Sequence, residues 1–166
     1  MKFSEAVALV EANELGRFIN KHSNGEYAVV SACRGELSKA ENYKRTKELK
    51  EKLQASKFSF KPVKGGYIEN LGKSNQKEVY ENSFMIYGYS KDGEPIKPKE
   101  LFNYAIKLCK EYGQDSILYS KHGEEPTYYN KSGSKEFSPG KNMKLNDKSQ
   151  EYFSEFGKNK RFSLTQ

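Results

Sequence analysis

Six polar side chains stand where the hydrophobic pattern predicts strand ends or a buried helix face, and their types could do acid–base or anion-binding chemistry. Arg34 follows the first predicted strand, and Glu81 and Ser83 lie two residues apart, on one face of a later strand. A glutamate can act as a general base and an arginine can hold an anion, so this set would suit a phosphate-containing substrate. The candidates for a ligand site or polar network are Arg34, Asn42, Arg45, Glu81, Ser83 and Gln114.

The same residues could equally have a structural role. Asn42 and Arg45 are three residues apart at the start of a predicted helix and share one face of it. A buried pair between Arg45 and Glu81, with Asn42, Ser83 and Gln114 satisfying the remaining hydrogen bonds, would fix a helix on a sheet. Perturbed charges gather in structural networks as well as in functional sites, so a structural network is at least as well favoured as a ligand site.

Several kinds of chemistry have no support in the sequence. His22 and His122 are the only histidines, and neither has a neighbour at metal-ligand spacing or begins a His-x-Ser/Thr pattern. Cys33 and Cys109 are too few for a disulfide framework, and Cys33 is interpreted as a small buried thiol rather than a nucleophile. Because no nucleotide-binding glycine motif occurs either, we expect no metal, no cofactor and no recognised catalytic residue, and we favour a non-enzymatic protein.

Positive charge is concentrated in two segments of the chain. The 29 Lys and Arg outnumber the 22 Asp and Glu, giving a formal charge of +7. Residues 39–64 carry +6 and residues 131–166 carry +4, so the remainder of the chain is acidic. Such segments could hold a polyanion, although a solvated lysine-rich face is the more common explanation. The candidate nucleic-acid contacts are Lys44, Lys47, Lys50, Lys61, Lys64 and Arg161.

The composition excludes several classes of protein. The chain has 166 residues, enough for one domain with a sizeable core, and only 35% of them are hydrophobic. Aromatic residues reach 13%, and disordered chains are poor in them. No apolar run approaches the roughly 18 residues that a membrane span requires. These features predict a polar-surfaced, tyrosine-rich globule in the cytoplasm, with no membrane contact.

The hydrophobic periodicity predicts an α+β fold. Residues 4–22 form one or two helices, residues 41–56 and 98–112 form amphipathic helices, and the strands run over 27–33, 58–63, 78–89, 116–120 and 127–130. Gly65 and Gly66 are expected to break or bulge a strand. Residues 132–148 read as a loop, followed by a short helix at 150–156 and a strand at 161–164.

The order of these elements favours a split βαβ (ferredoxin-like) arrangement. Two helices would then cover one face of a mainly antiparallel sheet, with an N-terminal helix and a C-terminal β extension added. We expect a single domain over residues 1–166. It consists of an N-terminal helical segment (1–24), an α+β core (27–133), and a basic loop with a C-terminal element (134–166).

A spaced set of short motifs resembles a family of small phage and bacterial proteins that contain a domain of unknown function. The set comprises Ser31-Ala-Cys-Arg-Gly-Glu36, Glu41-Asn42-x-x-Arg45, Glu81-x-Ser-Phe84 and Tyr112-Gly-Gln-Asp-Ser-Ile117, together with Pro62-Val-x-Gly-Gly-Tyr-Ile-Glu69. It covers roughly residues 27–133. Cys33 replaces a more usual aromatic residue or asparagine, and Asn82 stands where a second glutamate is common. The resemblance implies an accessory gene of a phage or mobile element, and it carries no established activity.

Three hypotheses about function follow. The first is an accessory protein that binds a nucleic acid, or a nucleotide or phosphate ligand, through its basic helix and tail, with nearby aromatic rings for stacking. The second is a protein that contacts a host protein or is packaged in the virion, with the polar set purely structural. The third is a hydrolase or transferase for a phosphate-containing substrate, with Glu81 as base and Arg34 or Arg45 holding the anion.

Overall fold

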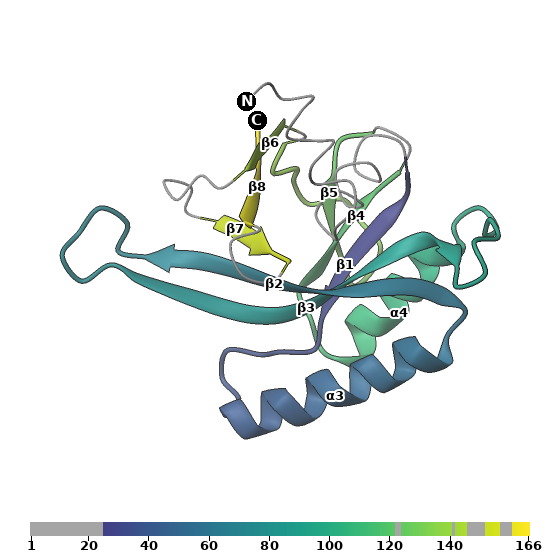
Figure 1. Cartoon of the computed structure of the whole chain (residues 1–166), viewed down its shortest axis with the longest axis horizontal. Helices are drawn as coiled ribbons and strands as arrows, with labels where there is room; N and C mark the ends of the chain where they lie inside the picture. The colour runs from purple at the N-terminus through teal and green to yellow at the C-terminus, as the bar shows by residue number, and fades with distance from the viewer. Residues whose placement is uncertain (1–24, 122–123, 141, 146–151, 157–160) are drawn as a thin grey trace.

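The computed structural model describes residues 25–121, 124–140, 142–145, 152–156 and 161–166. The predicted N-terminal helix at residues 4–22 lies outside the described residues. Within them the protein is α+β, with two helices and one eight-stranded sheet whose neighbouring strands pair antiparallel (Figure 1). No helix among these residues is long and apolar enough to cross a membrane.

Four strands form the centre of the sheet. They are β1 (Tyr27–Ser31), β2 (Phe58–Glu69), β3 (Lys77–Ser90) and β4 (Ser116–Ser120). β3 pairs with both β1 and β2, and β1 also pairs with β4. Adding β5 (Thr127–Asn130), β6 (Asn142–Leu145), β7 (Tyr152–Glu155) and β8 (Arg161–Thr165) gives the order β5-β4-β1-β3-β2-β7-β8-β6.

Helices α3 (Lys39–Ala55) and α4 (Glu100–Glu111) cover one face of the sheet. Leu49 and Leu53 of α3 lie one helical turn apart and are fully buried. They belong to one apolar cluster with α4 and with alternate residues of β1 and β3, namely Ala28, Val30, Phe84, Ile86, Leu101 and Ala105. The period of two along the strands therefore sends the residues between them to the opposite face.

A capping box begins α3. The Ser38 side chain accepts a hydrogen bond from the Glu41 backbone N–H at 3.1 Å, and the Glu41 carboxylate accepts one from the Ser38 backbone N–H at 2.8 Å. We expect Ser38→Ala to lower the free energy of unfolding by about 1 kcal/mol in urea titrations. An unchanged midpoint would show that the cap contributes nothing.

The capping box also predicts a pH dependence. The hydrogen bond from the Ser38 backbone lowers the pKa of Glu41. A lowered pKa in the folded state means that this contribution is present above the unfolded-state value of about 4.3 and is lost as the pH falls below it. The stability difference between wild type and Glu41→Gln should accordingly shrink below about pH 4.

The C-terminal strands differ from the sequence prediction. The helix predicted at residues 150–156 is wrong, because Tyr152–Glu155 is strand β7, paired with β2. The loop predicted at 132–148 contains strand β6, which pairs with β8, and the strand predicted at 161–164 is confirmed as β8. Short polar segments such as Asn142–Leu145 carry little periodicity, and they become strands only through partners far along the chain.

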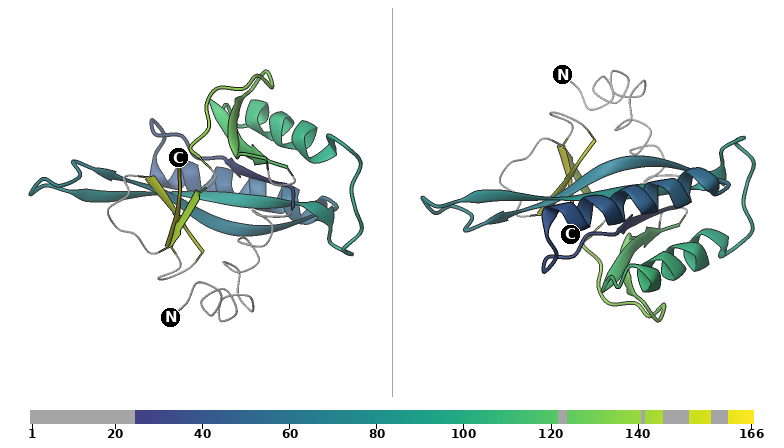
Figure 2. Two further views of the ribbon diagram at one scale, coloured as in Figure 1. Left: turned by 90° about the horizontal axis from the view of Figure 1, so that it is seen from above. Right: turned by 90° about the horizontal axis from the view of Figure 1, so that it is seen from below.

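Gly65 and Gly66 do not interrupt β2, which continues unbroken to Glu69. β2 and β3 form a long ribbon whose far end, residues 66–80, projects from the body and is called the hairpin arm below (Figures 1 and 2). Tyr67 and Tyr80 of the arm are 41% and 45% exposed.

Gly66 is required by the packing of β7 on β2. A Cβ at this position would lie 2.4 Å from the ring of Phe153, which is its pairing partner in the sheet. We expect Gly66→Ala to lower the free energy of unfolding by about 1–3 kcal/mol because the ring must move. Gly65→Ala is the matched control, since a Cβ there meets nothing closer than 3.7 Å. Equal stabilities of the two variants in thermal unfolding would contradict this explanation.

Candidate functional site

A cavity of about 500 Å³ opens on the sheet face that the helices leave uncovered. Its floor consists of alternate residues of the central strands, and β5 and β8 contribute further walls. Val29, Met85 and Leu118 supply an apolar part, which continues into the cluster of Val63, Phe156 and Phe162. The lining also includes hydroxyl, carboxylate, amide and guanidinium groups. The cavity can therefore take an amphipathic ligand with a flat apolar part and a charged end.

A hydrogen-bonded pair of polar residues stands on the floor of the cavity. Ser31 Oγ donates to Glu81 Oε1 at 2.7 Å and also lies 3.0 Å from the carbonyl oxygen of Asn82. The Cys33 backbone N–H donates to the same Oγ at 3.1 Å, which holds the hydroxyl in place. Glu81 has no Lys or Arg partner among the described residues. Its carboxylate is therefore an oriented negative charge that is available to a cationic ligand.

Ser83 stands next to this pair. It is opposite Ser31 in the β1–β3 register and opposite Val63 in the β2–β3 register, and it is 9% exposed. Its hydroxyl has no hydrogen-bond partner in the described part of the chain. Ser83 lines the cavity, so its hydroxyl is a further group to which a bound molecule could hydrogen-bond.

Arg34 lies at the edge of the cavity, on the loop that leaves β1. Its guanidinium donates to the Glu36 carboxylate and to the carbonyl oxygen of Gly113. The hydrogen bond from Arg34 lowers the pKa of Glu36, so this carboxylate stays ionised under mildly acidic conditions. Asn42 of α3 fixes the Arg34 backbone from below: its side chain accepts from the Arg34 N–H and donates to the Arg34 carbonyl, both at 2.9 Å.

Arg45 and Gln114 brace the same loop. Arg45 donates to the carbonyl oxygens of Ala32, at 2.7 Å, and of Tyr112. Gln114 Nε2 donates to the carbonyl oxygen of Cys33 at 2.8 Å. Both side chains thus tie the end of β1 to the turn after α4.

The predicted pair of Arg45 and Glu81 is not formed. Arg45 reaches the sheet from the helix side, whereas Glu81 is two residues from Ser83 and points to the cavity side. Of the six predicted polar residues, Arg34, Glu81, Ser83 and Gln114 line the cavity, while Asn42 and Arg45 hold the loop beneath it.

The sequence set omitted part of the lining. Gly65 and Tyr67 of β2, Tyr128 of β5 and Ser154 of β7 also border the cavity. Strand alternation could have identified Gly65 and Tyr67, because they follow Val63 at steps of two. Nothing in the sequence indicates that β7 pairs with β2 at this point.

The predicted nucleic-acid contacts do not form one surface. Lys44, Lys47 and Lys50 are exposed on α3, beneath the sheet, with glutamates interspersed. Lys61 and Lys64 lie on β2. The C-terminal strands stand on the other side of the sheet from α3 (Figure 1). Helix α3 and the described C-terminal strands therefore lie on opposite sides of β2 and β3.

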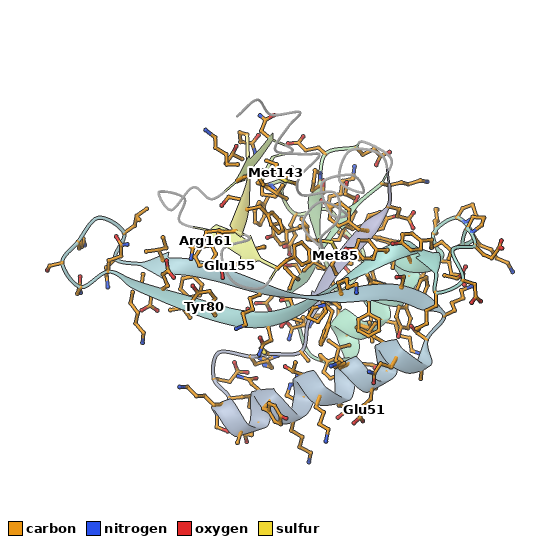
Figure 3. All side chains as sticks on the ribbon, viewed as in Figure 1. Glu51, Tyr80, Met85, Met143, Glu155 and Arg161 are labelled. Atoms are coloured by element: carbon orange, nitrogen blue, oxygen red, sulfur yellow. The ribbon has the colours of Figure 1, made fainter. Side chains whose placement is uncertain are left out.

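Arg161 is buried rather than exposed. Its guanidinium donates to Glu155 at 2.8 Å and to Glu78 at 3.0 Å, and it stacks over the Phe153 ring at 3.8 Å from the centroid. Figure 3 shows Arg161, Glu155 and Tyr80 together where β7 and β8 meet the hairpin arm. Arg161 therefore joins these strands to the arm and is not available to a polyanion.

Comparison with known families adds an independent finding. The S-Adenosylmethionine lyase family matches residues 28–164, which include all but the first residue of β1 and nearly all of β8. The match also overlaps most of the segment that carries the resemblance to phage proteins. No curated protein matches the chain. Because the match spans most of the sequence and every strand of the sheet, the chain belongs to the S-adenosylmethionine lyase family.

Proposed function

We propose that the protein cleaves S-adenosylmethionine in the cavity beside Glu81. The observation that carries this proposal is the family match over residues 28–164, whose strands build the cavity. A volume of about 500 Å³ lies within the range of pockets that take small ligands. The proposal changes the sequence-based preference for a non-enzymatic protein.

The groups of S-adenosylmethionine have counterparts in the cavity. The adenine ring is flat and largely apolar, and Val29, Met85 and Leu118 offer a surface of that kind. The amino acid end carries an ammonium and a carboxylate. Glu81 is suited to the ammonium and Arg34 to the carboxylate, since hydrogen bonds between oppositely charged groups are stronger than those between neutral groups.

The chemistry needs little help from protein groups. The sulfonium is an activated leaving group, so the substrate's own carboxylate oxygen can attack its Cγ atom. The Cγ–S bond then breaks and its electron pair stays on sulfur. The products are 5′-methylthioadenosine and homoserine lactone, and no proton or water is consumed. Positive and negative charge cancel as the bond forms, so a partly apolar cavity favours the reaction over bulk water.

In this scheme Glu81 is a positioning group. Displacement requires the substrate to fold back so that its carboxylate lies in line with the Cγ–S bond. Holding the ammonium on the oriented carboxylate of Glu81 would fix that bent shape, and correct orientation alone can supply much of a rate enhancement. The hydrogen bond from Ser31 keeps the Glu81 carboxylate in its place.

The test is incubation of the purified protein with S-adenosylmethionine and chromatography of the adenosine-containing products. We expect 5′-methylthioadenosine to accumulate in proportion to protein and time, above the spontaneous background. A protein that leaves S-adenosylmethionine intact would refute the proposal.

The other sequence-based hypotheses have less support. Binding of nucleic acid would need basic groups on one surface, and here α3 and Arg161 do not provide one. An encounter with a host protein or packaging in a virion stays a hypothesis. Expression from an accessory gene of a phage, in the cytoplasm of the host, is compatible with the proposed reaction and is part of our proposal.

A further inference from the structure

We propose that the sulfonium methyl group of the substrate packs against the backbone of Gly65. The absence of a Cβ at this position would leave the room in the cavity that a sulfonium needs. This inference rests on the proposed function and names the part of the substrate that touches strand β2. It makes Gly65 a specificity-determining residue.

The fold gives no reason for a glycine at position 65. Gly65 lies within an extended strand and does not have the positive φ that favours glycine. Among the described residues, a Cβ added there would meet nothing closer than 3.7 Å, so none of them excludes a side chain. Glycine inside a strand weakens the strand, and it often marks a bulge, a tight bend or the close approach of another group. The β2–β3 register runs without a shift through Gly65, so a bulge is not the reason here.

The neighbouring Gly66, by contrast, is required by the packing of the fold. A Cβ at Gly66 would lie 2.4 Å from the Phe153 ring, so the packing of β7 excludes one. Gly65 faces the other way, into the cavity between Glu81 and Ser154, its pairing partners on the two sides. Since no atom of the described residues fills the space above Gly65, a ligand is the group that we place against the backbone there.

Two oxygen atoms border the space above Gly65. The position that a Cβ would occupy is 3.7 Å from the carbonyl oxygen of Glu81 and 3.8 Å from Ser83 Oγ. A methyl group of a ligand would stand farther from the Gly65 Cα than a bonded Cβ, and it could reach this position only because glycine has no Cβ. The positive sulfur polarises the C–H bonds of its methyl group, so such a methyl group prefers oxygen atoms as neighbours.

The surrounding charges agree with this placement. Gly65 and Glu81 are opposite each other in the sheet, so the Glu81 side chain stands on the same face as the space above Gly65. Its carboxylate provides negative charge near a bound sulfonium. The Ser83 hydroxyl, which has no partner in the described part of the chain, would accept the polarised C–H contact.

The test pairs a methyl group added to the protein with one removed from the ligand. Gly65→Ala fills the space, so it should raise KM for S-adenosylmethionine about tenfold, as expected for overpacking of a tight site. S-Adenosylhomocysteine has no sulfonium methyl group, and its inhibition constant should change by less than about twofold. Lys64→Ala is the control, because Lys64 is the neighbouring exposed residue on the opposite face of β2; it should leave both constants unchanged.

The outcomes separate this inference from the proposed function. If the wild-type protein neither binds nor cleaves S-adenosylmethionine, both the proposed function and this inference are refuted. If the wild type cleaves it and Gly65→Ala does so with the same KM, only the inference is refuted. Equal weakening of both ligands would also refute it, because that result reports a general disturbance of the cavity. A further arm uses S-adenosylethionine, whose larger ethyl group the wild type should bind less well than the methyl compound.

Discussion

Replacing Glu81 by glutamine is expected to lower kcat/KM for S-adenosylmethionine by about a hundredfold or more. The change removes one negative charge and keeps the size of the side chain. Loss of one partner from a desolvated charge pair costs about 2–5 kcal/mol, which corresponds to this loss of rate. Stability should change little, because Glu81 is exposed and, within the described residues, its carboxylate accepts a side-chain hydrogen bond from Ser31 alone. Steady-state kinetics and urea titration measure the two effects separately.

Glu69→Gln is the matched control for Glu81→Gln. Glu69 is an exposed glutamate at the end of β2 and does not line the cavity. We expect its kcat/KM to equal that of the wild type. If Glu81→Gln retained full activity, the assignment of Glu81 to the substrate's ammonium group would be wrong, even with cleavage itself established.

Replacing Arg161 by methionine should cost about 3–5 kcal/mol of unfolding free energy, the usual result of removing one partner from a buried ion pair. The Arg161 side chain is 7% exposed and holds Glu155, which is 15% exposed, and Glu78. Methionine removes the guanidinium that pairs with these two carboxylates, together with its stacking on Phe153. Urea unfolding at neutral pH provides the measurement.

Two further variants separate the effect of losing a buried charge from the effect of losing any positive charge. Lys47→Met removes a positive charge from the exposed face of α3 and should change stability by less than about 0.5 kcal/mol. Adding Glu155→Gln to Arg161→Met should recover part of the loss, because one uncompensated carboxylate is then neutral. A fully stable Arg161→Met variant would show that the strands β7 and β8 are held to the arm by other contacts.

Strand alternation predicts the position of the candidate site better than the pairing of charges does. Phe84 and Ile86 face the helices. Successive residues of a strand point to opposite faces, so Ser83 and Glu81 lie on the face away from the helices. The same reasoning excludes the predicted pair of Arg45 and Glu81, since a residue of α3 cannot reach the far side of the sheet. The periodicity therefore places Glu81 and Ser83 on the cavity face, whereas Arg34 and Gln114 lie outside the strands and are not placed by it.

The C-terminal part of the site could not be predicted from local patterns. Ser154 and Phe162 border the cavity because β7 pairs with β2, a contact between segments far apart along the chain. Strand pairing of this kind depends on tertiary context, which a four-residue segment does not reveal. The proposed chemistry would leave no motif either, because an internal displacement of a sulfonium requires no metal, no nucleophilic side chain and no phosphate loop.

The most direct test of the account follows the oxygen atoms of the product. S-Adenosylmethionine is cleaved by the purified protein in water enriched in ¹⁸O, and the amino acid product is examined by mass spectrometry. We predict homoserine lactone without ¹⁸O, and homoserine from its later hydrolysis with the label confined to the carboxyl group. A label on the Cγ oxygen would show that water attacks the substrate, and the absence of any cleavage would show that this chain is not a lyase; either result would contradict the account.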